Sequence, residues 1–236
     1  MEFAALKEVF DRDGYVVIDD MFEPTMMDRL ECSIAEHFGD RPGFLHDDHF
    51  ISKAKTEVIP WFPQREGIGD FDGIEQDPRV RELSTRVLGD GWESQYCMVM
   101  FSRAGSSGQA WHQDCDPSDP ERYNLNRLVY TRDIRDETGG QPVVVPGSHR
   151  RGLLEAGDPM ADLEGQVVLR PGKGSLVLLH GHTWHRVLPV VNGANRSSTN
   201  FRAAPKGTPQ DITDVCVYRN MRYRFSTAEV VEERVS

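Results

Sequence analysis

The sequence has few cysteines, no long apolar run and fewer basic than acidic side chains. Its four cysteines, Cys32, Cys97, Cys115 and Cys216, are scattered and form no C-x-x-C pair, so they do not indicate a zinc site or a redox dithiol. No stretch approaches the roughly 18 apolar residues of a membrane-spanning helix, and acidic residues stand where a signal peptide has a cationic start. We therefore expect a cytosolic protein.

Acidic side chains outnumber basic ones by 38 to 27, which gives a formal net charge of −11. A field of this sign repels a phosphate backbone, so nucleic acid is not an expected partner. The 236 residues suit one sizeable domain, and no internal break favours two. We expect a single domain over residues 1–236.

Helices are expected near the start, and short strands over most of the remainder. Apolar residues at helical spacing predict helices over about residues 2–14, 24–39 and 77–89. Residues 40–77 show few periodic signals and are interpreted as a long loop region, with room for one short helix, that could form a lid over a site. Further on, eight short apolar segments separated by turn signals fit a sandwich or barrel. They are 94–101, 126–134, 141–146, 165–171, 175–180, 184–191, 198–205 and 215–220.

Two segments, WHQD at 111–114 and HGHTWH at 180–185, carry candidate metal ligands. Two histidines and one carboxylate hold iron on one face and leave the other open, which is typical of non-haem Fe(II) oxygenases. His112 and Asp114 are two residues apart and therefore point to the same side of a strand. An isolated H-x-D pair is common by chance, so a third ligand must come from a distant strand. His180, His182 and His185 are the candidates, and strand parity alone does not choose among them.

An arginine beyond this segment could bind a diacid. Asn192-Gly193 is a type I′ hairpin signal between two apolar runs. It would place Arg196 opposite Pro189, about 13 Å along the strand from His185. From there an inward guanidinium could grip the far carboxylate of a small diacid whose near end chelates the metal. This geometry describes 2-oxoglutarate beside iron.

These motifs resemble the phytanoyl-CoA dioxygenase-like family of Fe(II)/2-oxoglutarate oxygenases. The matching segments are DGYVVIDDMFEPTMMDRL, WHQD, DETGGQPVVVPGSHRRG, and GSLVLLHGHTWH with an arginine eleven residues after its last histidine. The resemblance covers most of the chain. It implies a mainly β fold, a double-stranded β-helix or cupin-like jelly-roll barrel, with flanking helices.

The resemblance also implies the site and its chemistry. His112, Asp114 and His185 would be the metal ligands and Arg196 would bind 2-oxoglutarate, with Fe(II) as cofactor and O2 as the second cosubstrate. The implied reaction is hydroxylation of an unactivated C–H bond of a small-molecule metabolite, with release of succinate and CO2. Related halogenases leave the position of Asp114 to halide, so a carboxylate there favours hydroxylation over halogenation. Desaturation, ring closure and demethylation stay open as outcomes.

Other positions match the family less closely. Similar proteins place an aromatic residue against the cosubstrate where Tyr130 stands, although Tyr130 is nearly as well interpreted as a core residue. Gln95 matches a cosubstrate-contacting position of some relatives. Many relatives have a hydroxyl side chain where this chain has Val187, and Thr131 or Ser198 could replace it. Arg202, deeper along its strand, is a weaker rival for the carboxylate-binding role.

Several alternatives remain open. A cupin-like metal-dependent isomerase or hydrolase could use the same barrel without 2-oxoglutarate, and it would not need Arg196. A non-catalytic relative could keep the barrel as a binding module. In the long loop, His46 and His49 could bind metal or lie in a solvated segment, and Trp61 and Phe62 could line a substrate pocket or cap the core. The substrate and the oligomeric state have no recognisable signature.

Overall fold

The computed structural model describes residues 2–39, 47–48, 51–52, 56–191, 193, 195–225 and 230–232. Its helices are α1 (Phe3–Asp13), α2 (Pro24–Phe38), α4 (Asp72–Glu75) and α5 (Pro78–Leu88), with 3-10 helices η1 (Pro63–Glu66), η2 (Ser148–Arg150) and η3 (Gln210–Asp214). Its strands are β1 (Tyr15–Ile18), β2 (Ile59–Trp61), β3 (Glu93–Ser102), β4 (Gln109–Gln113), β5 (Leu125–Val129), β6 (Pro142–Val144), β7 (Val167–Val168), β8 (Leu176–His180), β9 (His185–Val187), β10 (Arg196–Ala204), β11 (Val215–Tyr218), β12 (Met221–Phe225) and β13 (Val230–Glu232).

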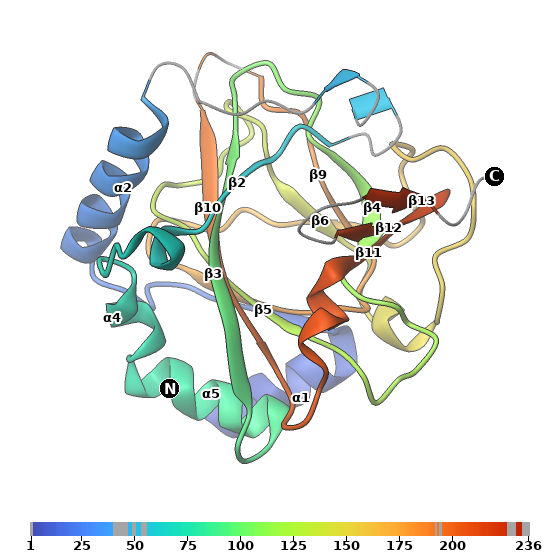
Figure 1. The fold of residues 1–236 in the computed structure, drawn as a ribbon, viewed down its shortest axis with the longest axis horizontal. Coiled ribbons are helices and arrows are strands. Elements are labelled where there is room, and N and C mark those ends of the chain that lie inside the picture. Colours follow the sequence, from blue (N-terminus) through green and yellow to red (C-terminus); the bar gives the residue numbers. More distant parts are fainter. Residues whose placement is uncertain are drawn as a thin grey trace.

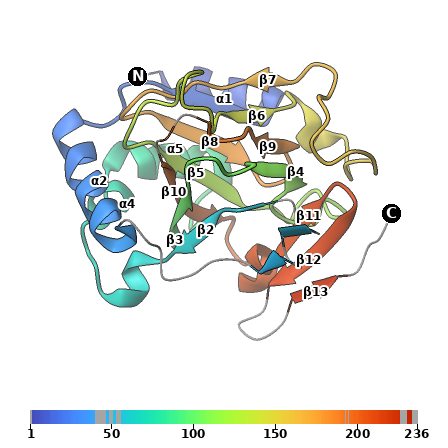
Figure 2. The same cartoon turned by 90° about the horizontal axis from the view of Figure 1, so that it is seen from above.

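Two antiparallel sheets form the body of the protein (Figure 1). The first has the strand order β1-β8-β5-β10-β3-β2, and the second has the order β13-β12-β11-β4-β9-β6-β7. Seen from above, α2 and α4 lie on one side of the molecule and β11, β12 and β13 on the other (Figure 2). This mainly β arrangement with flanking helices is the predicted jelly-roll. None of the described helices is long and apolar enough to cross a membrane.

Local sequence sets the helix ends. Helix α1 stops at Gly14, whose φ of 78° is left-handed and whose N–H donates to the carbonyl of Phe10 at 2.7 Å. Helix α5 begins after Asp77, whose carboxylate accepts the N–H of Arg79 at 2.8 Å, and Pro78 occupies its first turn. These signals explain why both helices were predictable from the sequence.

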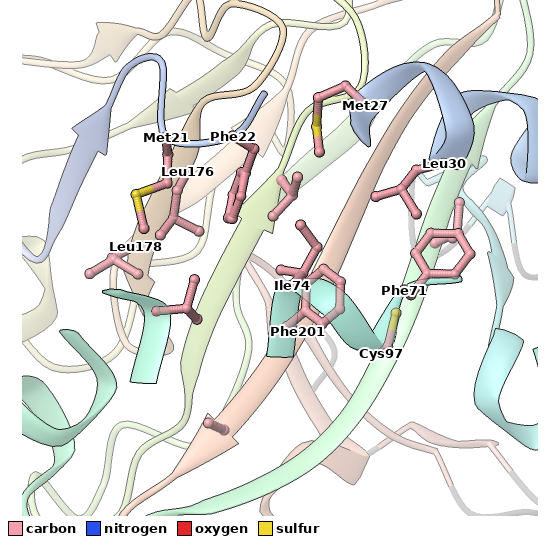
Figure 3. Close-up of a cluster of buried hydrophobic side chains, with 14 of the residues drawn as sticks. Met21, Phe22, Met27, Leu30, Phe71, Ile74, Cys97, Leu176, Leu178 and Phe201 are labelled. Carbon is pink, nitrogen blue, oxygen red and sulfur yellow. The ribbon is translucent and has the colours of Figure 1, made fainter. Parts of the chain in front are cut away.

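The first sheet separates an apolar core from a cavity. On its outer face, Cys97 of β3 and Phe201 of β10 belong to one buried cluster with Met27 and Leu30 of α2 and Ile74 of α4 (Figure 3). Alternate residues of the same strands line a cavity between the sheets. Because successive strand residues point to opposite faces, one face carries the helices and the other can carry a site.

The region predicted as a loop is more ordered than expected, because residues 56–77 contain β2, η1 and α4. Strand β2 is only three residues long, which is too short to show an alternation of apolar and polar residues in the sequence. Trp61 is 3% exposed and belongs to the apolar core, and its ring stacks on that of the exposed His37 with centroids 4.0 Å apart. Phe62 instead lines the cavity. Of the two interpretations left open for these residues, Trp61 therefore fits the one that caps the core and Phe62 fits the one that lines a pocket. His46 and His49 lie outside the described residues.

The predicted hairpin between residues 184–191 and 198–205 is wrong in its pairing. Strand β9 pairs with β4 and β6, whereas β10 pairs with β5 and β3 in the other sheet. Arg196 accordingly lies opposite Ser102 rather than Pro189. The predicted type I′ turn includes Asn192, which lies outside the described residues. Two adjacent apolar runs predict strands, but in a jelly-roll consecutive strands can cross between sheets.

Candidate active site

His112 and His185 lie opposite each other on neighbouring strands. The antiparallel register of β4 and β9 pairs them directly, and their ring centroids are 4.0 Å apart. Asp114 follows β4 and turns its carboxylate toward both rings. Its Oδ2 lies 3.3 Å from His185 Nε2 and its Oδ1 lies 3.8 Å from His112 Nε2. The Asp114 carboxylate thus lies within 3.8 Å of both predicted histidine ligands.

Hydrogen bonds to carbonyl groups fix which nitrogen each histidine offers. His112 Nδ1 lies 2.8 Å from the carbonyl oxygen of Ala110, and His185 Nδ1 lies 2.8 Å from that of Thr183. A carbonyl only accepts, so each Nδ1 must carry the proton. A metal ion would then bind the Nε2 atom of each ring, on the side that faces Asp114, which is the arrangement of metal-ligating histidines held by backbone carbonyls.

The segment HGHTWH also fixes the backbone of Asp114. The Asp114 N–H donates to the carbonyl of Gly181 at 2.8 Å, and the Asn124 amide donates to the Asp114 carbonyl at 3.2 Å. A side chain at residue 181 does not fit, because its Cβ would lie 2.2 Å from Asn124 Oδ1 and 2.7 Å from Cys115 Sγ. Gly181 therefore permits the close approach that brings the two motifs together.

Both carboxylate oxygens of Asp114 also meet buried polar side chains. Asn126 Nδ2 donates to Oδ2 at 2.7 Å, and Arg202 Nη2 lies 3.2 Å from Oδ1. Asn126 Oδ1 in turn accepts from Arg202 Nε at 2.9 Å and from Asn200 Nδ2 at 2.7 Å. Because an ionised carboxylate only accepts, the orientation of the Asn126 amide is determined. This network, which the sequence analysis missed, holds Asp114 in one orientation.

The network also sets the charges of the site. Burial alone raises the pKa of a carboxyl group, but Arg202 and His185 outweigh it and hold the pKa of Asp114 well below its usual value. Burial lowers the pKa of His112 to about 3, and His185 adds to that effect. Although burial lowers the pKa of Arg202, Asp114 raises it above its ordinary value. At neutral pH the site presents an ionised carboxylate and the neutral imidazole of His112 to a divalent cation.

Cys216 of β11 places a thiol beside the same centre. Its Sγ, a ring nitrogen of His112 and a carboxylate oxygen of Asp114 all lie within 4.8 Å of one another. Burial, with Asp114 adding to it, raises the pKa of Cys216 well above its ordinary value. Without a metal ion the thiol is therefore protonated. Cys216 is a fourth donor group beside the two imidazoles and the carboxylate predicted from the sequence.

Arg196 opens β10 as a buried cation with no carboxylate partner among the described residues. Its Nε and the hydroxyls of Tyr130 and Ser198 have no well-formed hydrogen bond to any described residue. The guanidinium carbon lies 5.9 Å from the centre of the Tyr130 ring. Burial lowers the pKa of Arg196, and Tyr130 offsets part of that effect. A buried cation beside two hydroxyls that lack well-formed hydrogen bonds fits the carboxylate of a ligand.

The hydroxyls of Ser198 and Thr131 could each replace the one missing at Val187, but they have different surroundings. Ser198 lies two residues beyond Arg196 on the same face of β10 and lines the cavity, as Val187 does. Thr131 does not line it, and its hydroxyl donates to Glu31 Oε2 at 2.5 Å. Ser198 is thus the one of the pair that is placed to meet a ligand.

Gln95 is not among the cavity-lining residues. It falls at a register irregularity of β3, between the pairs Ser94–Ala203 and Tyr96–Arg202. Tyr96 lines the cavity instead. Gln95 Oε1 is buried without a partner in the described part of the chain, and its contact with the cosubstrate stays a prediction.

The other histidines of HGHTWH form a separate cluster. The ring of His180 lies 5.0 Å from that of His182 and 5.1 Å from that of His149, and it stacks on Tyr123 at 4.2 Å. His182 Nε2 lies 3.1 Å from the carbonyl of Arg122. None of these three histidines lines the cavity. Their surroundings favour a role in packing.

The candidate ligands and Arg196 share one cavity of about 440 Å³ between the sheets. The volume suits a small molecule, since such sites measure roughly 300–1,000 Å³. Apolar side chains such as Met98, Leu128 and Val177 form much of its wall. A few polar groups are therefore set in mostly apolar surroundings, which is typical of ligand-binding pockets.

Sequence comparison finds relatives along most of the chain. The phytanoyl-CoA dioxygenase family matches residues 10–201. A curated relative, the Fe(II)/2-oxoglutarate-dependent dioxygenase nvfF of Aspergillus novofumigatus, is 26% identical over 166 residues. The match covers 61% of this chain and 53% of the relative, so the chain spans about half the length of the curated relative that it matches.

Solved structures share the fold at low identity. The 2-oxoglutarate-dependent epimerase SnoN from nogalamycin biosynthesis superposes with a TM-score of 0.69 at 17% identity, covering 92% of this chain and 85% of SnoN. HygX from Streptomyces hygroscopicus, solved with nickel, 2-oxoglutarate and hygromycin B, gives 0.66 at 15% identity over 86% and 87% of the two chains. These likenesses confirm the jelly-roll fold.

Proposed function

We propose that this chain, which belongs to the phytanoyl-CoA dioxygenase family, hydroxylates an unactivated C–H bond of a small-molecule metabolite. Fe(II), 2-oxoglutarate and O2, the cofactor and cosubstrates expected from the sequence, are those of its family. Succinate and CO2 would be the coproducts. In this proposal His112, Asp114 and His185 hold the metal.

The observation that carries the proposal is the directly paired histidines with their Nε2 atoms turned to one carboxylate. Both Nδ1 atoms are engaged by carbonyl groups, so both Nε2 lone pairs are available. Asn126 and Arg202 orient the Asp114 carboxylate. Two imidazoles and one carboxylate suit Fe(II) and leave coordination positions for other ligands. When bound, the iron with its cosubstrates supplies the oxidising power for C–H cleavage.

The residues around Arg196 support 2-oxoglutarate as the cosubstrate. The guanidinium would hold the distal carboxylate, and the Ser198 and Tyr130 hydroxyls could donate hydrogen bonds to the same group. Val177 and Leu179 of β8 are nearly fully buried residues of the cavity wall, so they would limit water around the bound cosubstrate. Binding, orientation and exclusion of water are therefore the tasks of this chain's own side chains.

Relatives support a small-molecule substrate, while the outcome of the reaction varies among them. SnoN was solved with nogalamycin RO and HygX with hygromycin B. SnoN is an epimerase and the related SnoK is a carbocyclase. Asp114 supplies a carboxylate where related halogenases leave room for halide, so hydroxylation is favoured over halogenation. Mass spectrometry of the product distinguishes the proposed hydroxylation from the reactions of these relatives, since hydroxylation adds one oxygen atom and epimerisation or ring closure adds none.

Anaerobic addition of Fe(II) and 2-oxoglutarate tests the assignment directly. A visible metal-to-ligand charge-transfer band should develop in the unmutated protein and in His182→Ala, but not in His185→Ala. His182 is the matched control because it belongs to the same motif and lies outside the cavity. Absence of the band from the unmutated protein would refute the proposal. Metabolites that stimulate succinate release would then identify substrates.

Two rival functions make different predictions in the same assay. A cupin-like isomerase or hydrolase would bind metal and turn over without 2-oxoglutarate, and it would tolerate replacement of Arg196. A non-catalytic binding module would show no metabolite-stimulated succinate release. Loss of 2-oxoglutarate-dependent activity in Arg196→Ala would therefore favour the oxygenase over both.

A further inference from the structure

The charge of the cavity is opposite to the charge of the chain. The chain has 38 acidic side chains, yet Asp114 is the only carboxylate among the described residues that line the cavity. Four arginines share these walls: Arg65, Arg186, Arg196 and Arg202. A cavity with apolar walls and an excess of one charge focuses its field, so the part of this cavity that its arginines line favours anionic groups.

Three of these arginines already have a task. Arg186 pairs with Asp162, Arg202 pairs with Asp114, and Arg196 would hold 2-oxoglutarate under the proposed function. Arg65 differs from them, because it is exposed and pairs with no carboxylate in the described ranges. It belongs to η1, which follows β2. Its charge is therefore available to a ligand that enters the cavity.

Aromatic rings connect Arg65 to the metal-ligand candidates. The Arg65 guanidinium carbon lies 3.9 Å from the centre of the Phe62 ring. The Phe62 ring meets the Tyr96 ring edge to face, with centroids 5.5 Å apart and planes at 84°. Arg202 lies 5.4 Å from the centre of the Tyr96 ring and 3.2 Å from Asp114. The series runs from an exposed cation to the carboxylate of the site.

The side chains of this series would be complemented by a substrate that has a flat apolar part and an anionic group. Phe62 and Tyr96 offer ring surface to a flat apolar body, because aromatic rings gain from stacked or edge-to-face contact. Arg65, at the exposed end, offers a fork of donors suited to a carboxylate. A cationic group at the same position would face Arg65 without a compensating carboxylate from any described wall residue.

We propose that the substrate has a flat apolar body that packs against Phe62 and Tyr96 and a carboxylate that Arg65 binds at the outer end of the cavity. The carbon that reacts then lies at the end of the molecule remote from its carboxylate, toward Asp114. This inference rests on the proposed function for the reaction itself. The recognition by Arg65 can be measured without turnover.

Three probes of one shape test it: 2-naphthoate, neutral 2-naphthamide and cationic 2-naphthylmethylammonium. Their affinities are measured by calorimetry under anaerobic conditions, with the protein saturated with Fe(II) and 2-oxoglutarate so that Arg196 is occupied. Naphthoate should bind most tightly and the ammonium probe most weakly. Arg65→Gln should weaken naphthoate binding by about three- to fivefold, the upper part of the range expected of an exposed ion pair, and leave naphthamide binding unchanged.

Two variants complete the design. Arg65→Lys should retain part of the preference for naphthoate. Arg151→Gln should change nothing, because Arg151 is also an exposed arginine over an aromatic ring, 4.2 Å from the centre of Trp184, but lies outside the cavity. The proposal is overturned if naphthamide or the ammonium probe binds as tightly as naphthoate, if Arg65→Gln weakens naphthoate and naphthamide equally, or if no probe binds at millimolar concentration.

The proposed function fails separately from this inference. Absence of the charge-transfer band would refute the oxygenase assignment and leave the order of probe affinities to be judged alone. An intact band with no preference for naphthoate would refute only the role of Arg65.

Discussion

Arg127 and Arg196 are both buried on the first sheet, but on opposite faces of it. Arg127, on the helix side, has its charge fully partnered: Nη2 donates to both carboxylate oxygens of Glu75 at 2.8 and 3.0 Å, and Nε donates to the carbonyl of Phe201 at 2.7 Å. Arg196, on the cavity side, has no carboxylate partner within the described residues. Burying a charge without a partner costs free energy, so the second arginine indicates a ligand and the first a structural role.

The largest effect is expected from breaking the partnered arginine. Arg127→Met would leave Glu75 without its cation and remove the Arg127 donor from the Phe201 carbonyl, so the free energy of unfolding should fall by about 3–5 kcal/mol. Chemical denaturation measures this. Glu75→Leu combined with Arg127→Met should recover part of the loss, because it removes both charges. A loss below about 1 kcal/mol in the single variant would show that the pair is not a structural anchor.

Arg196→Met should have the opposite consequence for stability. It removes a desolvated charge that has no partner, so the free energy of unfolding should stay constant or rise. Affinity for 2-oxoglutarate should fall by about 2–5 kcal/mol, which is about 30-fold or more, because the bound carboxylate loses a buried cation. Titration of the charge-transfer band measures the affinity. A strongly destabilised variant that still bound 2-oxoglutarate normally would reverse the contrast between the two arginines.

Replacing Asn126 tests whether the polar side chains on the cavity face hold the Asp114 carboxylate in place for the metal. Asn126→Ala removes the hydrogen bond to Asp114 Oδ2, and loss of such a partner weakens metal binding by about 10- to 100-fold. Asn200→Ala should have a smaller effect, because Asn200 contacts Asn126 and not Asp114. Fe(II) titration at saturating 2-oxoglutarate compares the two variants. Equal losses would mean that the carboxylate is not oriented through Asn126.

Much of the fold was predictable because its signals are local. Apolar spacing and end residues defined α1, α2 and α5, and each of the eight predicted strand segments overlaps a strand. Strand β4 was not among them, although it carries His112, because its polar and apolar residues do not alternate and all but the first are buried. Strand partners were not predictable, since two apolar runs with a turn between them do not specify the sheet that each one joins. The single domain over residues 1–236 stays a prediction.

The candidate site was predictable where its residues form short motifs. The candidate ligands His112, Asp114 and His185 came from two such motifs and a family resemblance. The contacts of Arg202 and Asn126 with Asp114 join three distant segments, so no local pattern could indicate them. One partial signal was present, because residues 196, 198, 200 and 202 are all polar and lie on one face of their strand. Ser197 and Thr199 between them are polar as well, so the sequence alone does not choose the face.

The smallest expected effect is that of removing the Ser198 hydroxyl. This hydroxyl is the candidate to replace the one that many relatives have at the position of Val187. Ser198→Ala should weaken 2-oxoglutarate binding by about 0.5–1.5 kcal/mol, the usual range for one hydrogen bond. Thr131→Ala is the matched control, because Thr131 also carries a buried hydroxyl but donates it to Glu31 outside the cavity. It should lower the free energy of unfolding without changing cosubstrate affinity. The affinity for 2-oxoglutarate and the free energy of unfolding can be measured for both variants. If Thr131→Ala weakened 2-oxoglutarate binding and Ser198→Ala did not, Thr131 and not Ser198 would contact the cosubstrate.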